Sequence, residues 1–330
     1  MVPLSVPTGE GFKRKLGFSA WLIRNSGAIW REVRKADAVH TPIPGDVGTI
    51  GMLFALLQRK PLFVRHCGNW FVQRTLAERF WKWAMERFAG GKNVMLATGG
   101  GAIPPSEKNP NIKWIFSTSL TATQLSEGRP RQLSNDRGPR LITVCRQEEG
   151  KGTDVVIDSL PLIAQAFPDV TLDVVGDGSK LVALKRRAES LGVSERVIFH
   201  GKVAQSRVPE LLKSADIFCY PTAASEGFPK VVVEALASGL PVITTKVSVL
   251  PHLISSGCGL ILDSTTPVAL ADAIRRIGSD REVYSEMSTR AVETAANYSL
   301  ENWGHFIFRE LRESWGNIST DLNCPTIERI

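Results

Sequence analysis

The chain has 330 residues, of which 43% are hydrophobic and 22% are charged, so it exceeds the usual size of one domain and is predicted to form two globular domains. Residues 1–138 contain 20 basic and 9 acidic residues and the remainder 20 and 24, so the front of the chain supplies the net charge of +7. The longest apolar runs, such as residues 51–57, are far shorter than the roughly 20 residues of a membrane helix, and neither a span nor a secretory signal is expected.

The front half alternates predicted helices with short apolar strands. Residues 11–37 are predicted to form one or two basic amphipathic helices, with an apolar face drawn from Phe18, Trp21, Leu22 and Trp30. The elements expected next are a strand at 36–42, a helix at 48–60, a strand at 61–66 and a Trp-rich helix at 70–88. This alternation is typical of a parallel sheet flanked by helices.

The back half shows the same alternation more clearly. A polar stretch at 134–140 is predicted to be a linker. Predicted strands follow at 141–145, 170–176, 197–201, 217–222, 240–245 and 260–263, with helices at 153–167, 181–193, 208–215, 230–238 and 268–278. Five or six strands separated by helices predict a right-handed, doubly wound parallel sheet.

Polar residues after the first strand of this sheet suit a diphosphate. Ligands of doubly wound sheets bind at the carboxyl ends of the strands, and Arg146 directly follows a strand there. Lys151 ends the same loop between Gly150 and Gly152. Arginine binds phosphate bidentately, lysine supplies a compact charge, and glycines allow close backbone approach. A plain solvated loop is the alternative interpretation.

Residues 225–243 carry a more specific signal. Pro229 is placed as the first residue of a helix and Gly239 as its left-handed stop, so the N-terminus of the helix would offer free amides to a phosphate. Glu226 and Glu234 frame this N-terminus. Glu234 lies within an apolar helix, where an unpaired carboxylate is costly. A hydroxyl-rich ligand would satisfy it, and so would a structural lysine or arginine.

The sequence encodes no metal or cofactor signature. The five cysteines are scattered without CxxC pairs, and they are Cys67, Cys145, Cys219, Cys258 and Cys324. Residues 174–179 (VVGDGS) form a glycine loop after a strand, but a GxGxxG fingerprint, a P-loop and a GxSxG elbow are absent. No metal and no cofactor are therefore expected.

Together these segments resemble family 4 of the retaining glycosyltransferases, the glycosyl transferases group 1. Residues 144–152 (VCRQEEGKG) resemble the family's first strand end, residues 172–179 (LDVVGDGS) its second glycine loop, and residues 214–245 its signature of two glutamates separated by seven residues. The resemblance covers roughly 139–275. It implies an α/β chain of the GT-B fold, with two Rossmann-like domains facing across a cleft and a shortened N-terminal domain.

By this resemblance, an acceptor-side domain would span 1–137, completed by a C-terminal helix at about 298–316, and a donor-binding domain would span 138–297. Arg146 and Lys151 would hold the donor diphosphate. The other implied donor contacts are the glycine loop at Gly176, backbone near Gly201 to Val203 at the base, Glu234 at the ribose, and Glu226 with the amides of Gly227 and Phe228 at the sugar.

The front half matches the family less well. His66 falls where a histidine often faces the reacting sugar, and functional and structural roles stay open for it, whereas His40 is interpreted as structural. The family's opening strand, glycine-rich loop and helix are replaced by residues 1–15, so the chain could be incomplete, depend on a partner, or be inactive. Residues 245–253 lack the family's usual glycine pair and acidic residue.

The sequence thus predicts a metal-independent, retaining glycosyltransferase that uses a nucleotide-diphosphate sugar for polysaccharide, glycolipid or glycoprotein assembly. A degenerate GT-B subunit without turnover is the main alternative, and a GT-B sugar-nucleotide epimerase is a lesser one. The expected acceptor is a carbohydrate or a lipid-linked molecule. A cytoplasmic location is expected, with peripheral contact to the inner face of the membrane through the basic front half left open. Nucleic acid is not expected because no motif for it accompanies the charge.

Overall fold

The structure, a computed structural model, describes residue 4, residues 11–134 and residues 137–316, with side chains of the first helix from residue 17 onward. Contacts divide the chain into two compact units. Unit 1 comprises Met1–Thr98, Ile103–Trp114 and His305–Ile330, and unit 2 comprises Gly99–Ala102 and Ile115–Gly304. Most of the opening segment, together with Cys324, lies outside the described residues.

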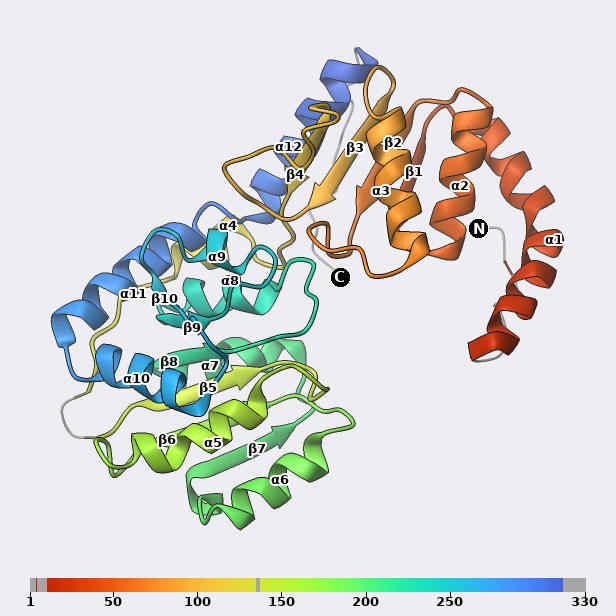
Figure 1. The fold of residues 1–330 in the computed structure, drawn as a ribbon. Coiled ribbons are helices and arrows are strands. Elements are labelled where there is room, and N and C mark those ends of the chain that lie inside the picture. The colour runs from red at the N-terminus through yellow and green to blue at the C-terminus, as the bar shows by residue number, and fades with distance from the viewer. Residues whose placement is uncertain (1–3, 5–10, 135–136, 317–330) are drawn as a thin grey trace. The chain divides into compact units, whose positions relative to one another are not determined.

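Unit 1 holds a four-stranded sheet in the order β1-β2-β3-β4, with β1, β2 and β3 parallel (Figure 1). Its strands are β1 (Val39–Ile43), β2 (Leu62–His66), β3 (Asn93–Thr98) and β4 (Ile112–Ile115). Its helices are α1 (Gly11–Lys35), α2 (Asp46–Leu57), α3 (Leu76–Phe88) and the second part of α12 (Leu300–Trp315). The predicted alternation of strands and helices is therefore present.

Residues 11–35 form one helix, and its apolar face belongs to the core of unit 1. Trp21, Ile29 and Val33 are buried with the sheet residues, and the ring of Trp30 meets Phe54 of α2 edge-on at 5.1 Å. In the part of α1 whose side chains are described, the amphipathic pattern thus serves to cover a core.

The Trp-rich helix was predicted from residue 70, but α3 begins at Leu76. The Thr75 hydroxyl accepts the Glu78 amide at 3.2 Å, and the Glu78 carboxylate accepts the Thr75 amide at 2.8 Å. This capping box fixes the start of the helix. Upstream, the Asn69 side-chain oxygen accepts the amides of Phe71 and Val72, which holds these residues in a turn.

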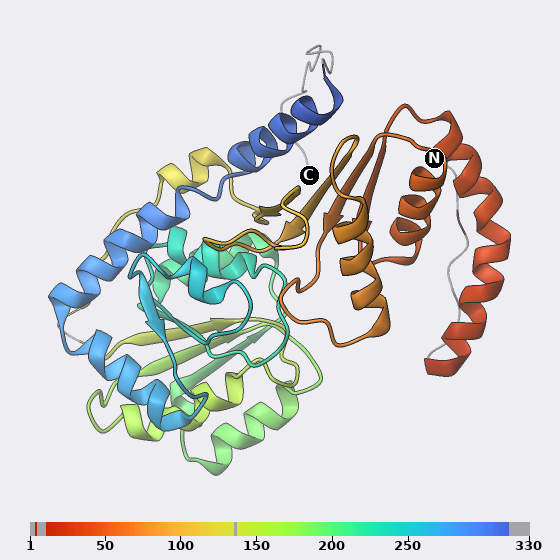
Figure 2. The same ribbon diagram turned by 45° about the horizontal axis from the view of Figure 1, so that its top comes forward.

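Unit 2 holds a six-stranded sheet in the order β10-β9-β8-β5-β6-β7, and its helices lie in layers on both faces (Figures 1 and 2). Its strands are β5 (Arg140–Val144), β6 (Thr171–Val175), β7 (Val197–Gly201), β8 (Ile217–Tyr220), β9 (Val242–Thr244) and β10 (Gly259–Ile261). All neighbouring strands are parallel. The predicted doubly wound sheet is confirmed.

The helices of unit 2 fill two hydrophobic clusters, one on each face of this sheet. They are α4 (Ala122–Ser126), α5 (Thr153–Ile163), α6 (Leu181–Ser190), α7 (Val208–Ser214), α8 (Lys230–Ala237), α9 (Leu250–Leu253), α10 (Pro267–Gly278), α11 (Arg281–Ala295) and the start of α12, with short 3-10 turns at Ser194–Arg196 and Gln205–Arg207. Strands β5 and β8 are central neighbours although three helices separate them in sequence. The strand order reverses between them, which is where such sheets bind ligands.

Residues 115–137, which the sequence analysis assigned to the first domain, group with unit 2 where they are described. Leu125 of α4 is buried in the core beside α8, and the Ser119 hydroxyl donates to the Glu234 carboxylate at 2.6 Å. Helix α12 begins in unit 2 and belongs to unit 1 from His305 onward. Its Glu310 pairs with Lys113 of β4 at 2.5 Å, and the Trp315 indole donates to the Lys92 carbonyl at 2.9 Å.

Candidate functional site

The loop after β5 docks on the loop after β8. Gly150 and Gly152 both have positive φ, at +76° and +82°. A Cβ on Gly152 would lie 2.2 Å from the carbonyl oxygen of Pro221, so only glycine fits there. The Gly150 carbonyl accepts the amides of Ala223 and Ala224 at 2.8 and 3.0 Å. Residues on the two loops are therefore brought together although more than 70 positions separate them.

This docking places Lys151 against Glu226. The Lys151 ammonium forms a close ion pair with Glu226 Oε1, and both side chains are largely shielded from solvent. The same oxygen accepts a hydrogen bond from the Tyr220 hydroxyl at 2.8 Å. Burial and the Glu226 charge raise the pKa of Tyr220, so the phenol stays protonated and remains a donor. Two residues predicted to bind the donor thus contact each other.

Arg146 lies at the carboxyl end of β5, as predicted, with its side chain exposed. It forms no salt bridge with the other residues that the structure describes. The loop behind it is held by Gln147, whose amide donates to the carbonyls of Cys145 and Val175 at 3.1 Å and whose oxygen accepts the Thr153 hydroxyl at 2.8 Å. The Gln147 hydrogen bonds therefore hold the loop that carries Arg146, whose guanidinium has no salt bridge among the described residues.

The glycine loop after β6 lies against the loop that carries Arg146. Gly176 has φ +116°, its amide donates to the Gly201 carbonyl at 2.8 Å, and a Cβ on it would lie 1.9 Å from the Cys145 carbonyl oxygen. Gly176 therefore allows the loops after β5, β6 and β7 to pack closely against one another. Val203 lies two residues beyond Gly201 and packs, half-buried, on the core beside α7.

Helix α8, which carries Glu234 and follows the loop of Glu226, is capped as the sequence indicated, with one correction. Pro229 was predicted as the first helical residue, but it is the N-cap, and α8 begins at Lys230. At the other end Gly239 has φ +72°, and the Leu240 amide donates to the Ala235 carbonyl at 3.1 Å, a Schellman motif. The first amides of an α-helix lack partners one turn back; in α8 the Val232 amide donates to the Pro229 carbonyl at 3.0 Å, and the N-terminus of the helix follows the carboxyl end of β8 in the chain.

An aromatic cluster fixes the loop before α8. The Phe228 ring lies 5.8 Å from Tyr298 and 6.4 Å from Phe116, and the latter two rings meet edge-on at 5.2 Å. The Ser248 hydroxyl donates to the Gly227 carbonyl at 3.3 Å. The backbone amides of Gly227 and Phe228 are thereby held beside Glu226.

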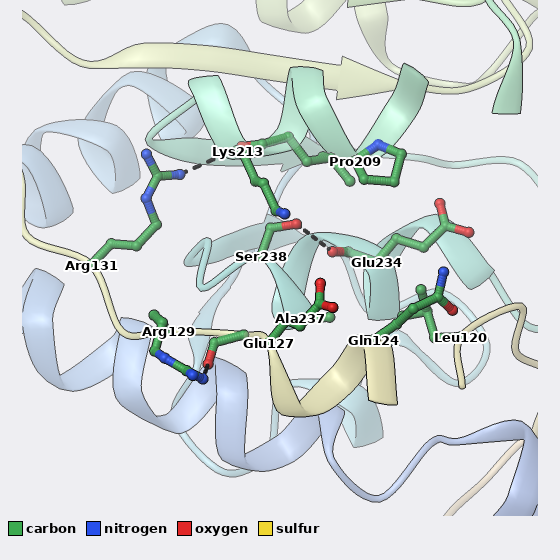
Figure 3. Close-up of a pocket in the computed structure, with 12 residues that line it drawn as sticks. Leu120, Gln124, Glu127, Arg129, Arg131, Pro209, Lys213, Glu234, Ala237 and Ser238 are labelled. Atoms are coloured by element: carbon green, nitrogen blue, oxygen red, sulfur yellow. Dashed lines mark hydrogen bonds between the residues drawn. The ribbon is translucent and has the colours of Figure 1, made fainter. Parts of the chain in front are cut away.

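Glu234 faces a cavity of about 320 Å³ (Figure 3). Its carboxylate accepts the Ser119 hydroxyl, and it forms no ion pair with any described lysine or arginine. Figure 3 shows α7, α8 and the segment around α4 surrounding the cavity. The lining includes Leu120, Gln124, Pro209, Leu212, Lys213 and Ser238. One hydroxyl partner leaves acceptor capacity on Glu234 for further hydroxyl groups.

His66 belongs to unit 1, at the carboxyl end of β2. Its side chain is 3% exposed, and its ring meets Trp70 edge-on at 5.3 Å. Burial lowers the pKa of His66 to about 4, so the imidazole is neutral at physiological pH. His40 stacks on Phe63 at 4.6 Å, a structural contact that needs no ligand.

Sequence reasoning missed two residues of this site. Tyr220 ends β8, so its place at the carboxyl end of a strand was a usable signal. Ser119 lies 115 positions before the carboxylate that it contacts, and nothing in the local sequence connects the two. Among the residues described, no group of three or more His, Cys, Asp or Glu side chains could hold a metal ion, and no helix is long and apolar enough to cross a membrane.

About half of the chain is similar in sequence to known glycosyltransferases. Residues 126–294 match the family model described as glycosyl transferases group 1. The chain is 30% identical over 175 residues to a GDP-mannose-dependent alpha-(1-6)-phosphatidylinositol monomannoside mannosyltransferase of Mycolicibacterium smegmatis, covering 50% of this chain and 45% of that protein. It is 33% identical over 163 residues to a D-inositol 3-phosphate glycosyltransferase of Corynebacterium glutamicum, covering 47% and 39%. The chain thus spans less than half the length of these relatives.

Solved structures show the same fold at low identity. Anabaena Alr3699/HepE in complex with UDP superposes with a TM-score of 0.72 at 19% identity, covering 87% of this chain and 82% of that one. A glycosyltransferase of Rickettsia africae gives a TM-score of 0.69 at 16% identity, covering 95% and 85%. The fold is GT-B, with two Rossmann-like domains. Since the family model matches just over half of its residues, this chain belongs to the glycosyl transferases group 1 family.

Proposed function

We propose that the protein transfers a sugar, with retention of anomeric configuration, from a nucleotide-diphosphate sugar to a carbohydrate or lipid-linked acceptor. The observation that carries the proposal is the contact of Lys151 with Glu226 beside the N-terminus of α8, at the point where the strand order reverses. A cation, free amides and a carboxylate together suit a ligand that carries both a diphosphate and sugar hydroxyls.

In this mechanism the Lys151–Glu226 ion pair opens when donor binds. The diphosphate then binds the ammonium of Lys151 and the guanidinium of Arg146. A sugar hydroxyl donates a hydrogen bond to the oxygen of Glu226 that Lys151 has left. Tyr220 keeps its hydrogen bond to Glu226 during the exchange, so the carboxylate is not left without a donor. Negative charge that develops on the leaving diphosphate is stabilised by the two cations and the dipole of α8, without a metal or other cofactor.

The remaining assignments rest on the same site. We assign the ribose hydroxyls to Glu234, and the edge of the base to backbone near Val203. The departing phosphate would help to deprotonate the acceptor hydroxyl, and His66 would face the reacting sugar as a neutral donor. The similarity to a GDP-mannose-dependent mannosyltransferase and to a D-inositol 3-phosphate glycosyltransferase favours a mannosyl donor and an inositol-containing acceptor. We propose a cytoplasmic protein that works at the inner face of the membrane.

The first test is thermal-shift binding of UDP, GDP and ADP, alone and as sugar conjugates. A nucleotide at a hundred times its dissociation constant stabilises the fold by about 2.7 kcal/mol, which corresponds to a shift of roughly 5 °C for a protein of this size. We expect one base to give the shift, Glu234→Ala to abolish it, and Glu189→Ala on the exposed face of α6 to leave it unchanged. No shift with any nucleotide would contradict the proposal.

A further inference from the structure

Helix α3 exposes a stripe of large apolar side chains between arginines. Leu76 is 81% exposed and Trp83 is 55% exposed. Arg79 and Arg87 are exposed on the same face, because positions 76, 79, 83 and 87 recur at the helical spacing. The opposite face buries Ala84 and Met85 in the core of unit 1. Trp83 contacts Phe80 and Phe88, which pack against this core, at ring distances of 5.9 and 6.0 Å, but more than half of Trp83 and most of Leu76 stay exposed.

The loop before the helix extends this stripe. Phe71 and Val72 are exposed, and the Asn69 turn holds both in place. The ring of Phe71 stacks on Trp114 at 5.1 Å, so the apolar groups are presented on an ordered segment. We call the set of Phe71, Val72, Arg74, Leu76, Arg79, Trp83 and Arg87 the α3 surface; α3 is orange in Figure 1.

The charge of the α3 surface is uniformly positive. Arg74, Arg79 and Arg87 are exposed and form no salt bridge with other residues in the described ranges. Both acidic residues of the segment are engaged elsewhere. Glu78 accepts the amides of Arg74 and Thr75 in the capping box, and Glu86 accepts the Ser106 hydroxyl at 2.9 Å and lies 3.7 Å from the Lys108 ammonium.

Aromatic and aliphatic side chains framed by arginines match the interface of an anionic bilayer. Tryptophan prefers the headgroup level, leucine and phenylalanine reach the acyl boundary, and arginines gain from anionic phosphates. In the same unit, Trp21, Ile29 and Val33 of α1 are buried in the core, although Ile23 of that helix is 82% exposed. The α3 surface also begins five residues after His66, at the carboxyl end of β2.

We propose that the α3 surface docks the protein on an anionic phospholipid membrane, with Phe71, Val72, Leu76 and Trp83 entering the interface and the three arginines contacting lipid phosphates. This inference rests on the proposed function. It names the surface through which the protein would reach a lipid-linked acceptor. Docking itself needs no donor nucleotide, so it is measurable independently of turnover.

The test is flotation with vesicles of phosphatidylcholine containing phosphatidylglycerol, compared with phosphatidylcholine alone. We expect wild type to float with the anionic vesicles and to be released by high salt. Leu76→Gln/Trp83→Gln should lower the vesicle partition coefficient on the order of ten-fold, and Arg79→Gln/Arg87→Gln by roughly five-fold for each arginine. The matched control is Val182→Gln/Val268→Gln, at side chains of unit 2 that are 62% and 57% exposed, which should float like wild type.

Three results would overturn the proposal: no binding of wild type to anionic vesicles, equal binding by the Leu76→Gln/Trp83→Gln variant, or an equal loss in the control variant. A loss of self-association in the α3 variant without vesicle binding by wild type would assign the surface to a second copy of the chain instead. Glu234→Ala should float like wild type, so failure of the donor site and failure of docking give different results. Circular dichroism of each variant checks that the fold is retained.

Discussion

At the scale of single residues, the centre of the site is Glu226, which accepts from Lys151 and Tyr220 through the same oxygen. A diphosphate can replace the carboxylate as the partner of Lys151, whereas the Tyr220 hydroxyl donates to no other acceptor among the residues that the structure describes. In the proposed mechanism the phenol is therefore the fixed support of Glu226, and the Lys151 ammonium is the group that changes partner when the donor binds.

Removal of the Tyr220 hydroxyl should impair the donor site without disturbing the core. A hydrogen bond to a charged group contributes about 1.5–3 kcal/mol, so Tyr220→Phe is expected to lower kcat/KM by roughly ten- to a hundred-fold. Steady-state kinetics with the donor identified by thermal shift would measure the change. Tyr298→Phe, a change in the aromatic cluster beside Phe228, is the matched control. Unchanged kinetics in Tyr220→Phe would show that Glu226 needs no such support.

His66 should make stability depend on pH. Burial lowers its pKa from 6.5 to about 4 in the folded chain. Above pH 6.5 the ring is neutral in both states. As the pH falls from 6.5 toward 4, the unfolded chain binds a proton that the folded chain excludes, so the free energy of unfolding falls by up to about 3 kcal/mol.

Urea unfolding at several pH values, compared with His66→Gln, would measure this contribution. The difference in pH dependence between the two proteins should lie between pH 6.5 and 4 and level off below. Parallel stability curves for both proteins across that range would mean that His66 protonates in the folded state as readily as in the unfolded chain.

At the scale of elements, α8 depends on its C-terminal stop. A Cβ on Gly239 would lie 2.5 Å from the Arg129 carbonyl oxygen, and its φ of +72° disfavours any L side chain. Gly239→Ala is expected to lower the free energy of unfolding by more than about 1 kcal/mol. Gly192→Ala, at φ +66° with no atom within 4 Å, isolates the conformational part of the cost. Equal denaturation midpoints for the two variants would contradict the steric argument.

Local sequence predicted the elements of unit 2 well because each is punctuated by its own residues. Pro229 and Gly239 delimit α8 to within one residue, and apolar runs mark the six strands. The start of α3 was predicted six residues too early because the apolar periodicity continues upstream through Phe71 and Val72. The Thr75 capping box makes the helix begin only at Leu76. Apolar periodicity alone does not locate the start of a helix; the capping residues, here Thr75 and Glu78, must be considered too.

The contacts within the site were less accessible to sequence reasoning. The resemblance selected Lys151, Glu226 and Glu234, but the direct pairing of the first two depends on the fit of Gly152 against Pro221 in the fold. Ser119 reaches Glu234 only because residues 115–134 pack on unit 2. Such long-range contacts follow from tertiary packing, which a single sequence does not display. The donor-contact roles of these residues stay predictions.

At the scale of the whole molecule, charge and chemistry are divided between the two units. The proposed donor-binding residues Arg146, Lys151, Glu226 and Glu234 all belong to unit 2. The exposed arginines and aromatic groups of the α3 surface belong to unit 1. Helix α12 contributes to both, and its buried Glu310 ties it to β4 of unit 1. The proposed donor chemistry and the proposed membrane contact are therefore expected to be separable by mutation.

Sugar transfer at the Lys151–Glu226 site is tested most directly by the release of nucleoside diphosphate from the nucleotide sugar that binds, followed by NMR with inositol-containing and lipid-linked acceptors. We predict release that depends on acceptor, a product with the donor's anomeric configuration, and a loss of at least about a hundred-fold in Glu226→Gln. Binding of the nucleotide sugar without release on any acceptor, or an equal rate in Glu226→Gln, would contradict the account.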